Sequence, residues 1–294
     1  MNNIDEKKTN ALIWYMGVRP CLRLSLELLY KNFNNKYKYP VLVTTFGKQY
    51  SKRFIKKIHQ EIDPNIKFIE LPKPKVPAHI KEKELFYNRK EIEYVRKSFP
   101  KSRIGFLYVD QFVAGLAMQY PEIRKYDYVL KMDDDHFFIK EFGFDIFKFM
   151  EDNGKLFGAF AMEKADSKRQ RDCQIGLRDL AKEYIKENNI QFQGEWDSLV
   201  SQDPTIWGMD IFKNKNWENW WNYVDQSGGI YKYRWGDLEI HALYMRMYYP
   251  DSVWHDFDYY NKEVVKHSGY GMVHYSWTLK KLQSLKRFLN EEII

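Results

Sequence analysis

The acidic triplet Asp133-Asp134-Asp135 is the part of the sequence best suited to chemistry, and it ends an apolar, β-favouring run at residues 128–132. Alternation along an extended chain predicts Asp133 and Asp135 on one side and Asp134 on the other. Two carboxylates on the same side of the chain provide hard oxygen ligands that suit Mg²⁺ or Mn²⁺. A solvated acidic turn is the alternative. Because aromatic residues flank the triplet on both sides, we favour a metal site in a lined cleft, with a nucleotide diphosphate as its partner.

Two further carboxylates stand in unusual surroundings. Asp210 lies in the aromatic segment 205–212, where a carboxylate is costly unless something uses it. It could be a nucleophile or general base, or a structural cap for the next helix. Asp237 and His241 are four residues apart and therefore share a helix face. That spacing is compatible with a metal pair, but a helix start with Asp237 as its cap is the stronger interpretation.

Three histidines, His255, His267 and His274, lie in an aromatic C-terminal segment. An imidazole next to a carboxylate-bound divalent ion is a suitable third ligand, especially for Mn²⁺. Taken singly, each of these histidines is better explained by a structural role.

The elements that must position these residues alternate between strands and helices. The apolar patterns predict strands at 11–18, 40–45 and 66–71, and helices at 22–30 and 51–62, the second capped by Ser51. This alternation indicates an α/β fold with a Rossmann-like sheet. In such sheets ligands bind at the carboxyl ends of the strands, which is where the acidic triplet falls.

Beyond these elements, the prolines at 72–77 predict an extended connector, and a helix at 103–120 leads to the acidic strand. A helix at 144–151 and a strand at 156–161 follow. The charged stretch 163–205, with a helix at 176–187, is interpreted as a surface insertion. An amphipathic basic helix at 278–290 could contact a membrane, although packing against the domain is the simpler expectation.

Composition narrows the classes of function. The chain has 294 residues, 17% aromatics and a net charge of +7, a balance that favours anionic ligands. No nucleic-acid-binding signature accompanies the charge, so no nucleic-acid partner is expected. Two cysteines form neither a disulfide framework nor a zinc site, which favours a reducing compartment. No stretch is apolar enough to span a membrane, so a soluble, cytoplasmic protein is predicted.

One segment resembles a known family. It reads Asp225-Gln-Ser-Gly-Gly-Ile-Tyr-Lys-Tyr-Arg-Trp-Gly-Asp-Leu-Glu-Ile-His241 and is similar to the hallmark region of the fungal α-1,2-mannosyltransferases, glycosyltransferase family 15. Other landmarks match in order, namely Val18-Arg19, residues 121–128, Val253-Trp-His, and His267-Ser-Gly-Tyr. The resemblance covers about residues 10–275 and is strongest from 205 to 241.

The resemblance implies a GT-A glycosyltransferase fold with a mixed central sheet in a single domain, residues 1–294. About 1–160 would form the nucleotide-sugar half and 161–294 the acceptor half. It further implies GDP-mannose as donor, Mn²⁺ (or Mg²⁺) as cofactor, and an α-1,2 link to a glycan or glycolipid acceptor with retained anomeric configuration.

The resemblance also implies roles for individual residues. Arg19, Asp133 and Asp134 would contact the nucleotide. The metal would be held by Asp133, Asp135 and His267. Asp210 takes the place of the family's proposed nucleophilic Glu, and Asp237 would orient the acceptor hydroxyl or accept its proton. The aromatic residues expected to border the acceptor sugar are Trp207, Tyr233 and Trp235, although each could equally be a core residue.

The chain departs from the family pattern in several places. The family has Glu-Pro-Asp or Glu-Pro-Gly where this chain has three aspartates, and Asp210 is one methylene shorter than the family's Glu. Gln111 stands where an Arg is expected. The family's cysteines and its Golgi membrane anchor have no counterpart in the sequence.

Other functions remain open at this stage. One is a GT-A transferase that uses a UDP-hexose or GDP-fucose, and another is a non-catalytic glycan-binding relative. The second is disfavoured because a binding module has no need for a metal that neutralises a diphosphate. A nucleotidyl- or phosphotransferase is disfavoured because the sequence has no glycine-rich phosphate loop.

Overall fold

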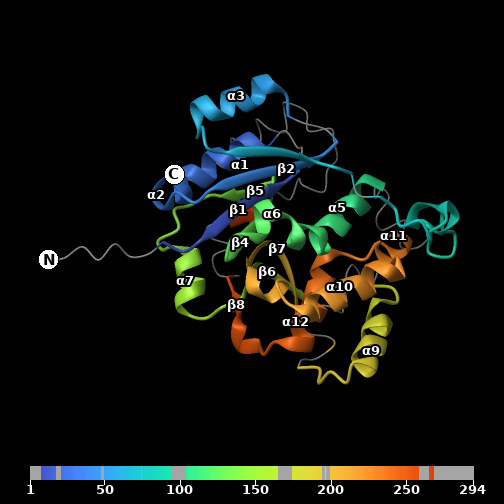
Figure 1. Ribbon diagram of the computed structural model, residues 1–294. Helices are drawn as coiled ribbons and strands as arrows, with labels where there is room; N and C mark the ends of the chain where they lie inside the picture. Colours follow the sequence, from blue (N-terminus) through green and yellow to red (C-terminus); the bar gives the residue numbers. More distant parts are fainter. Residues whose placement is uncertain are drawn as a thin grey trace.

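The protein is built around a seven-stranded mixed sheet with strand order β3-β2-β1-β4-β7-β6-β8 (Figure 1). The computed structural model describes residues 8–17, 21–47, 50–73, 75–93, 104–164, 174–193, 196, 199–257 and 265–267. The strands are β1 (Ala11–Met16), β2 (Val41–Phe46), β3 (Lys67–Leu71), β4 (Tyr128–Asp133), β5 (His136–Phe138), β6 (Phe157–Lys164), β7 (Leu199–Gly208), β8 (Trp254–Asp256) and β9 (Val265–His267).

The longer helices are α1 (Leu22–Leu29), α3 (Lys52–Glu61), α5 (Ile104–Ala114), α7 (Ile146–Asp152), α9 (Leu177–Glu187), α10 (Lys215–Ser227) and α12 (Asp237–Tyr248). Shorter turns of helix are η1 (Tyr30–Asn34), α2 (Asn35–Tyr37), η2 (Glu82–Glu84), η3 (Phe86–Asn88), η4 (Leu116–Gln119), α6 (Pro121–Arg124), η5 (Met209–Phe212), α11 (Gly229–Tyr233) and η6 (Asp251–Val253). No described helix is long and apolar enough to cross a membrane.

The first half of the sheet is parallel, as the alternation of elements predicts. β1 pairs in parallel with β2 and β4, and β2 pairs in parallel with β3. β1, β2 and β4 are buried along almost their whole length because both faces of the sheet are covered there, whereas the edge strand β3 is partly exposed. Ser51 caps α3 by accepting a hydrogen bond from the Phe54 N–H, as predicted. The carboxyl ends of β1 to β4 therefore share one edge of the sheet.

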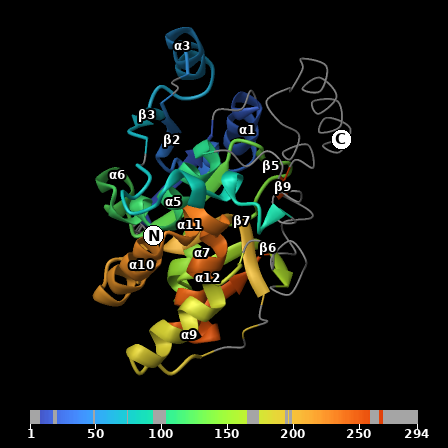
Figure 2. The same cartoon turned by 90° about the vertical axis from the view of Figure 1, so that its right-hand side faces the viewer.

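The two faces of the sheet support separate apolar cores. Leu12 and Trp14 of β1 contribute to a core with α5, α9, α10 and α12, whereas Ile13 and Tyr15 contribute to one with α1 and α7. Alternate residues of a strand point to opposite faces, so one buried strand supplies both cores. Figures 1 and 2 show the helices arranged around the sheet.

The interpretation of residues 163–205 as a surface insertion is wrong at its C-terminal end. β7 begins at Leu199 and lies inside the sheet, antiparallel to both β4 and β6. This strand was not predicted because Pro204 and the polar residues before it interrupt the apolar pattern. The predicted helix at 176–187 is confirmed as α9, which buries Leu177 and Tyr184. The predicted helix at 278–290 lies outside the described residues.

The helix predicted at 103–120 is divided at Gly115. α5 ends at Ala114, and η4 continues from Leu116 as a tighter turn. A Cβ atom at Gly115 would lie only 2.0 Å from the Trp221 side chain, so α10 packs where a larger residue would clash. The break therefore falls at the position where α10 packs closely on the backbone of this segment.

Candidate metal and nucleotide site

Three side chains converge where β4 ends. Among the described residues, only Asp133, Asp135 and His136 form a group whose ligand atoms all lie within 4.8 Å of one another. Asp135 and His136 are buried, and the Asp133 side chain is 30% exposed. Two carboxylates and an imidazole are a donor set that suits Mn²⁺. The structure thus brings Asp133 and Asp135 together, as the spacing predicts.

Asp134 lies apart from this group, as the alternation predicts. It is 1% exposed, and a Cβ atom built on Gly17 would lie 2.6 Å from its carboxylate. Gly17 also has φ of 146°, a conformation that other residues rarely adopt. The acidic turn therefore packs on the end of β1. Residues 18–20, which include the predicted nucleotide contact Arg19, lie outside the described residues.

Lys131 is a functional candidate that the sequence analysis missed. Its Nζ lies 3.0 Å from Oδ1 of Asp133, and its side chain is 5% exposed. A lysine inside an apolar strand needs a partner, and the Asp two positions later lies on the same strand face. That pattern is the signal that could have identified it. Lys131 offsets part of the repulsion among the three carboxylates.

Side chains of α1 and η1 hold the segment that follows the acidic turn. The Ser25 hydroxyl donates to the His136 carbonyl, and the Asn32 amide donates to the Phe138 carbonyl. Both donors are buried. β5 is therefore fixed to the first helix along one edge.

Along its other edge, β5 pairs with β9 in an antiparallel ladder that Figure 2 shows side by side. In this register His136 lies opposite His267. The backbone thus brings the predicted metal ligand His267 next to the acidic turn. Its role as a ligand stays a prediction.

Asp237 is the first residue of α12, and Gly236 occupies the N-cap position, so Asp237 is not the cap that the sequence predicts. It lies within electrostatic range of Asp110 and His241, two buried groups that Lys131 also influences. Burial raises the pKa of Asp110 well above its usual value, and the nearby Arg234 opposes this shift.

His241 lies one helical turn after Asp237, in the packing between α5 and α12. Its ring is buried, and Nε2 lies 3.0 Å from the Ala114 carbonyl, to which it donates. Burial lowers the pKa of His241 to about 4, with Asp237 acting in the opposite direction. This histidine is a neutral element of the packing between α5 and α12. The metal pair with Asp237 stays a prediction.

Asp210 lies at the wrong end of the sheet for catalysis at the acidic turn. β7 runs antiparallel to β4, and Gly208, two residues before Asp210, pairs with Tyr128 at the start of β4. The strand covers about 17 Å between Tyr128 and Asp133 at about 3.3 Å per residue. The Asp210 side chain is 83% exposed and lies 3.5 Å from Lys213. The prediction that Asp210 faces the reacting carbon is therefore wrong.

The same strand carries another aspartate, Asp203, at a backbone position nearer the acidic turn. Thr205 of β7 pairs with Lys131 of β4, and Asp203 lies two residues further toward the Asp133 end of that strand pair. Asp203 was not predicted as a site residue, because residues up to 205 were interpreted as an insertion.

The aromatic residues expected to border a sugar are mostly core residues. Trp207 is fully buried, and Trp235 is 3% exposed with its Nε1 donating to the Ile175 carbonyl. Tyr233 is half-buried beneath the Arg89 guanidinium, which lies 4.3 Å from the ring centre. The expectation for Trp207 is wrong, and Tyr233 is the most accessible of the three.

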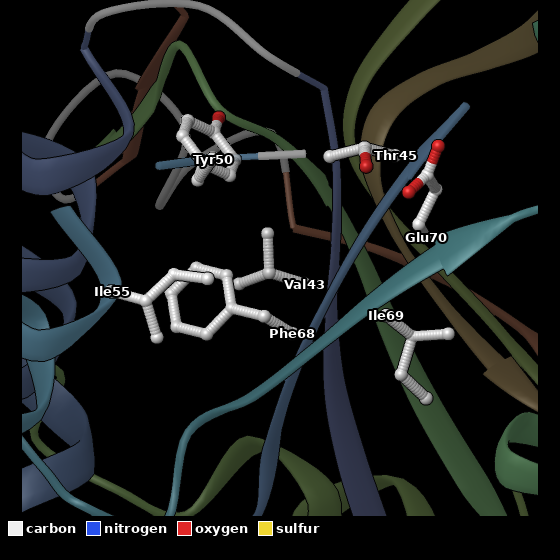
Figure 3. Close-up of a pocket in the computed structure, with 7 residues that line it drawn as sticks. All are labelled: Val43, Thr45, Tyr50, Ile55, Phe68, Ile69 and Glu70. Atoms are coloured by element: carbon white, nitrogen blue, oxygen red, sulfur yellow. The ribbon is translucent and has the colours of Figure 1, made fainter. Parts of the chain in front are cut away.

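A pocket opens between α3 and the ends of β2 and β3 (Figure 3). Its polar residues are Thr45, Tyr50 and Glu70, and Thr45 and Glu70 are register partners. Its apolar residues are Val43, Ile55, Phe68 and Ile69. The Tyr50 hydroxyl donates to the Gly17 carbonyl at 3.2 Å, which connects the pocket to the residue that packs on Asp134. The pocket and the acidic turn therefore share one edge of the sheet.

The sequence was compared with known families and proteins. The family model of glycolipid 2-alpha-mannosyltransferases matches residues 2–276. The probable mannosyltransferase KTR3 of Saccharomyces cerevisiae is 23% identical over 80% of this chain and 60% of its own length. The O-glycoside alpha-1,2-mannosyltransferase omh1 of Schizosaccharomyces pombe is 23% identical over 76% of this chain and 60% of its own. The chain spans about 60% of the length of these two relatives.

Solved structures share the fold. Core-mannan synthase A from Aspergillus fumigatus, in an Mn/GDP form, has a TM-score of 0.75 at 18% identity and covers 91% of this chain and 77% of its own. The mannosyltransferase Ktr4p from S. cerevisiae, in complex with GDP, has a TM-score of 0.76 at 18% identity over 89% of this chain and 71% of its own. The predicted GT-A fold with a mixed central sheet is confirmed.

Proposed function

This chain belongs to the glycolipid 2-alpha-mannosyltransferase family, and we propose that it transfers mannose from GDP-mannose to a mannose-like hydroxyl through an α-1,2 link with retained configuration. The observation that carries the proposal is the convergence of Asp133 and Asp135 at the carboxyl edge of the parallel strands. Ligands bind at this edge in open α/β sheets. The acceptor is a glycan or a glycolipid.

The metal-binding residues of the proposal are Asp133, Asp135 and His267. A divalent ion, Mn²⁺ or Mg²⁺, would supply charge that neutralises the departing diphosphate. Arg19, three residues after the last residue of β1, adds a fork of donors for the phosphates. Asp134 keeps the acidic turn seated on Gly17. The pocket at Thr45, Tyr50 and Glu70 lies on the same edge and suits the base or ribose of the nucleotide.

Two carboxylates would act at the sugars. Asp237, at the start of α12, orients the acceptor hydroxyl or accepts its proton. Asp203 takes the role first expected of Asp210, either as nucleophile or as the group that stabilises an oxocarbenium-like ion. Its position in β7, near the Asp133 end, supports this choice.

A set of donors tests the proposal. The protein is incubated with Mn²⁺ and with GDP-mannose, GDP-fucose, UDP-glucose or UDP-galactose, and release of the nucleotide is measured. GDP release from GDP-mannose that stops with EDTA and returns with Mn²⁺ supports it. Preferred release of UDP, or full activity in chelator, contradicts it.

Asp135→Asn is the variant for the metal in this assay. Because it removes one of the two converging carboxylates, we expect donor binding and turnover to fall by at least about tenfold, with little change in melting temperature. Asp152→Asn is the control, because Asp152 lies at the exposed end of α7.

Two finer points belong to the same proposal. The first is membrane contact, since a lipid-linked acceptor would bring the basic segment 278–290 near a membrane. The second is location, with the protein acting in the cytoplasm. Binding to vesicles that contain acidic lipids, compared between the full chain and one truncated after residue 277, tests the first point.

A further inference from the structure

His136 is the third member of the group that converges at the acidic turn, and its hydrogen bond distinguishes it from the two aspartates. The backbone N–H of Asp133 donates to Nδ1 of the His136 ring at 2.8 Å. The ring is 1% exposed. The side chain therefore reaches back across the turn and holds the residue that ends β4.

This hydrogen bond determines which ring nitrogen carries the proton. A backbone N–H cannot accept a hydrogen bond, so Nδ1 must be the unprotonated nitrogen, and in the neutral ring Nε2 carries the hydrogen. A histidine that binds a metal through one nitrogen normally donates a hydrogen from the other. His136 does the reverse, since its Nδ1 lone pair is used by Asp133.

We propose that His136 is a positioning residue for the metal site and not a metal ligand. Its Nδ1 fixes the backbone of Asp133, so that the Asp133 and Asp135 carboxylates are held together before an ion arrives. The nitrogen ligand then comes from another residue, and the predicted one is His267, whose backbone lies opposite His136 in the β5–β9 register. This inference rests on the proposed metal-dependent function.

The surrounding contacts support a positioning role. The His136 carbonyl accepts from the buried Ser25 hydroxyl, and Ser25 is 2.9 Å from the hydroxyl of Tyr15. Both the main chain and the side chain of His136 are therefore engaged in holding the turn on β1 and α1. A residue fixed at both ends holds its neighbours at low entropic cost when they bind an ion.

A pair of substitutions separates the two roles. In Asn the amide oxygen reaches the place of Nδ1, so His136→Asn keeps an acceptor for the Asp133 N–H. In Gln the amide group reaches the place of Nε2, so His136→Gln keeps a donor atom for a metal but loses the acceptor. His136→Ala removes both. Mn²⁺ affinity is measured by calorimetry on the full chain, with thermal melting to confirm folding.

We expect His136→Asn to bind Mn²⁺ within about threefold of the unaltered protein, and His136→Gln and His136→Ala to bind about 10- to 100-fold more weakly. Pulsed EPR of the bound Mn²⁺ should show the same nitrogen coupling in His136→Asn as in the unaltered protein. His267→Ala should lose that coupling. His255→Ala is the control, because β8 lies at the far edge of the sheet.

Two results overturn the inference. If His136→Gln keeps the affinity while His136→Asn loses it together with the nitrogen coupling, His136 is a ligand. If all three variants bind as the unaltered protein does, His136 does not position the site. Failure of the unaltered protein to bind Mn²⁺ would instead contradict the proposed function, and the inference with it.

Discussion

At the scale of single residues, the acidic turn depends on neighbours that compensate its charge. Asp133 has two partners in the turn. Its carboxylate pairs with the Lys131 ammonium, and its backbone N–H donates to the His136 ring. Asp134 occupies the space left by the missing side chain of Gly17. Three consecutive aspartates are tolerated because each carboxylate has different surroundings. Those of Asp133 and Asp135 still converge.

Lys131→Met tests this compensation. Because the substitution leaves Asp133 without its cation, we expect a loss of about 1 to 3 kcal/mol in the free energy of unfolding, below the cost for a fully buried pair since Asp133 is 30% exposed. Mn²⁺ should restore more stability to the variant than to the unaltered protein. Urea unfolding with and without Mn²⁺ measures both effects.

Lys148→Met is the matched control, because Lys148 pairs with Asp152 on the exposed surface of α7. Its cost should be about 1 kcal/mol or less and independent of Mn²⁺. An equal response to Mn²⁺ in both variants would contradict a specific role for Lys131.

Asp203 in β7 and Asp210 just after this strand give a second prediction about single residues. Asp210→Asn should leave turnover unchanged, since Asp210 follows the end of β7 that is remote from the acidic turn. Asp203→Asn should lower kcat by orders of magnitude with little change in donor affinity, the pattern of an interaction made in the transition state. Steady-state kinetics on the two matched variants decides between them, and loss of turnover in Asp210→Asn alone would restore the original assignment.

At the scale of elements, the sequence predicted those whose periodicity is uninterrupted. β1, β2, β4 and α1 are largely apolar in a continuous or regular pattern, so their positions could be predicted directly. β7 could not be predicted, because Pro204 breaks its pattern, although the strand lies between β4 and β6. Asp210 was preferred to Asp203 because of its aromatic surroundings and its match to the family's Glu. The direction of β7, which the sequence did not indicate, places Asp203 nearer the acidic turn.

The packing of α12 on α5 gives a pH-dependent prediction. Burial lowers the pKa of His241 to about 4 in the folded protein, below its unfolded value of about 6.5. The unfolded state therefore binds more protons between these values, and stability falls as the pH drops from about 6.5 to about 4. This histidine should account for about 2 kcal/mol of the loss between pH 7 and pH 5.

His241→Gln isolates that contribution, because glutamine retains a donor for the Ala114 carbonyl but does not titrate. Urea unfolding of both proteins at pH 5 and pH 7 gives the slope of the free energy of unfolding against pH for each protein, and the two slopes are compared. Equal slopes would show that His241 does not remain neutral inside the fold.

At the scale of the whole molecule, one sheet joins all parts of the proposed reaction. Its parallel half presents the acidic turn and the pocket of Figure 3 along one edge. Its antiparallel half brings β7, with Asp203, against the metal strand, and α12 packs on β7 with Asp237 at its start. The sequence indicated the fold class and the acidic turn. Lys131 could have been identified from its place in an apolar strand two residues before Asp133. The role of His136 required the folded chain, because a hydrogen bond across a turn has no sequence signature.

The product of the reaction tests the central claim most directly. The protein is incubated with Mn²⁺, GDP-mannose and α-methyl mannoside, and the product is analysed by NMR. The account predicts a disaccharide with an α-configured mannose linked to O2 of the acceptor, absent in EDTA and in the Asp135→Asn variant. A β-anomer, or transfer only from a UDP-sugar, would contradict it.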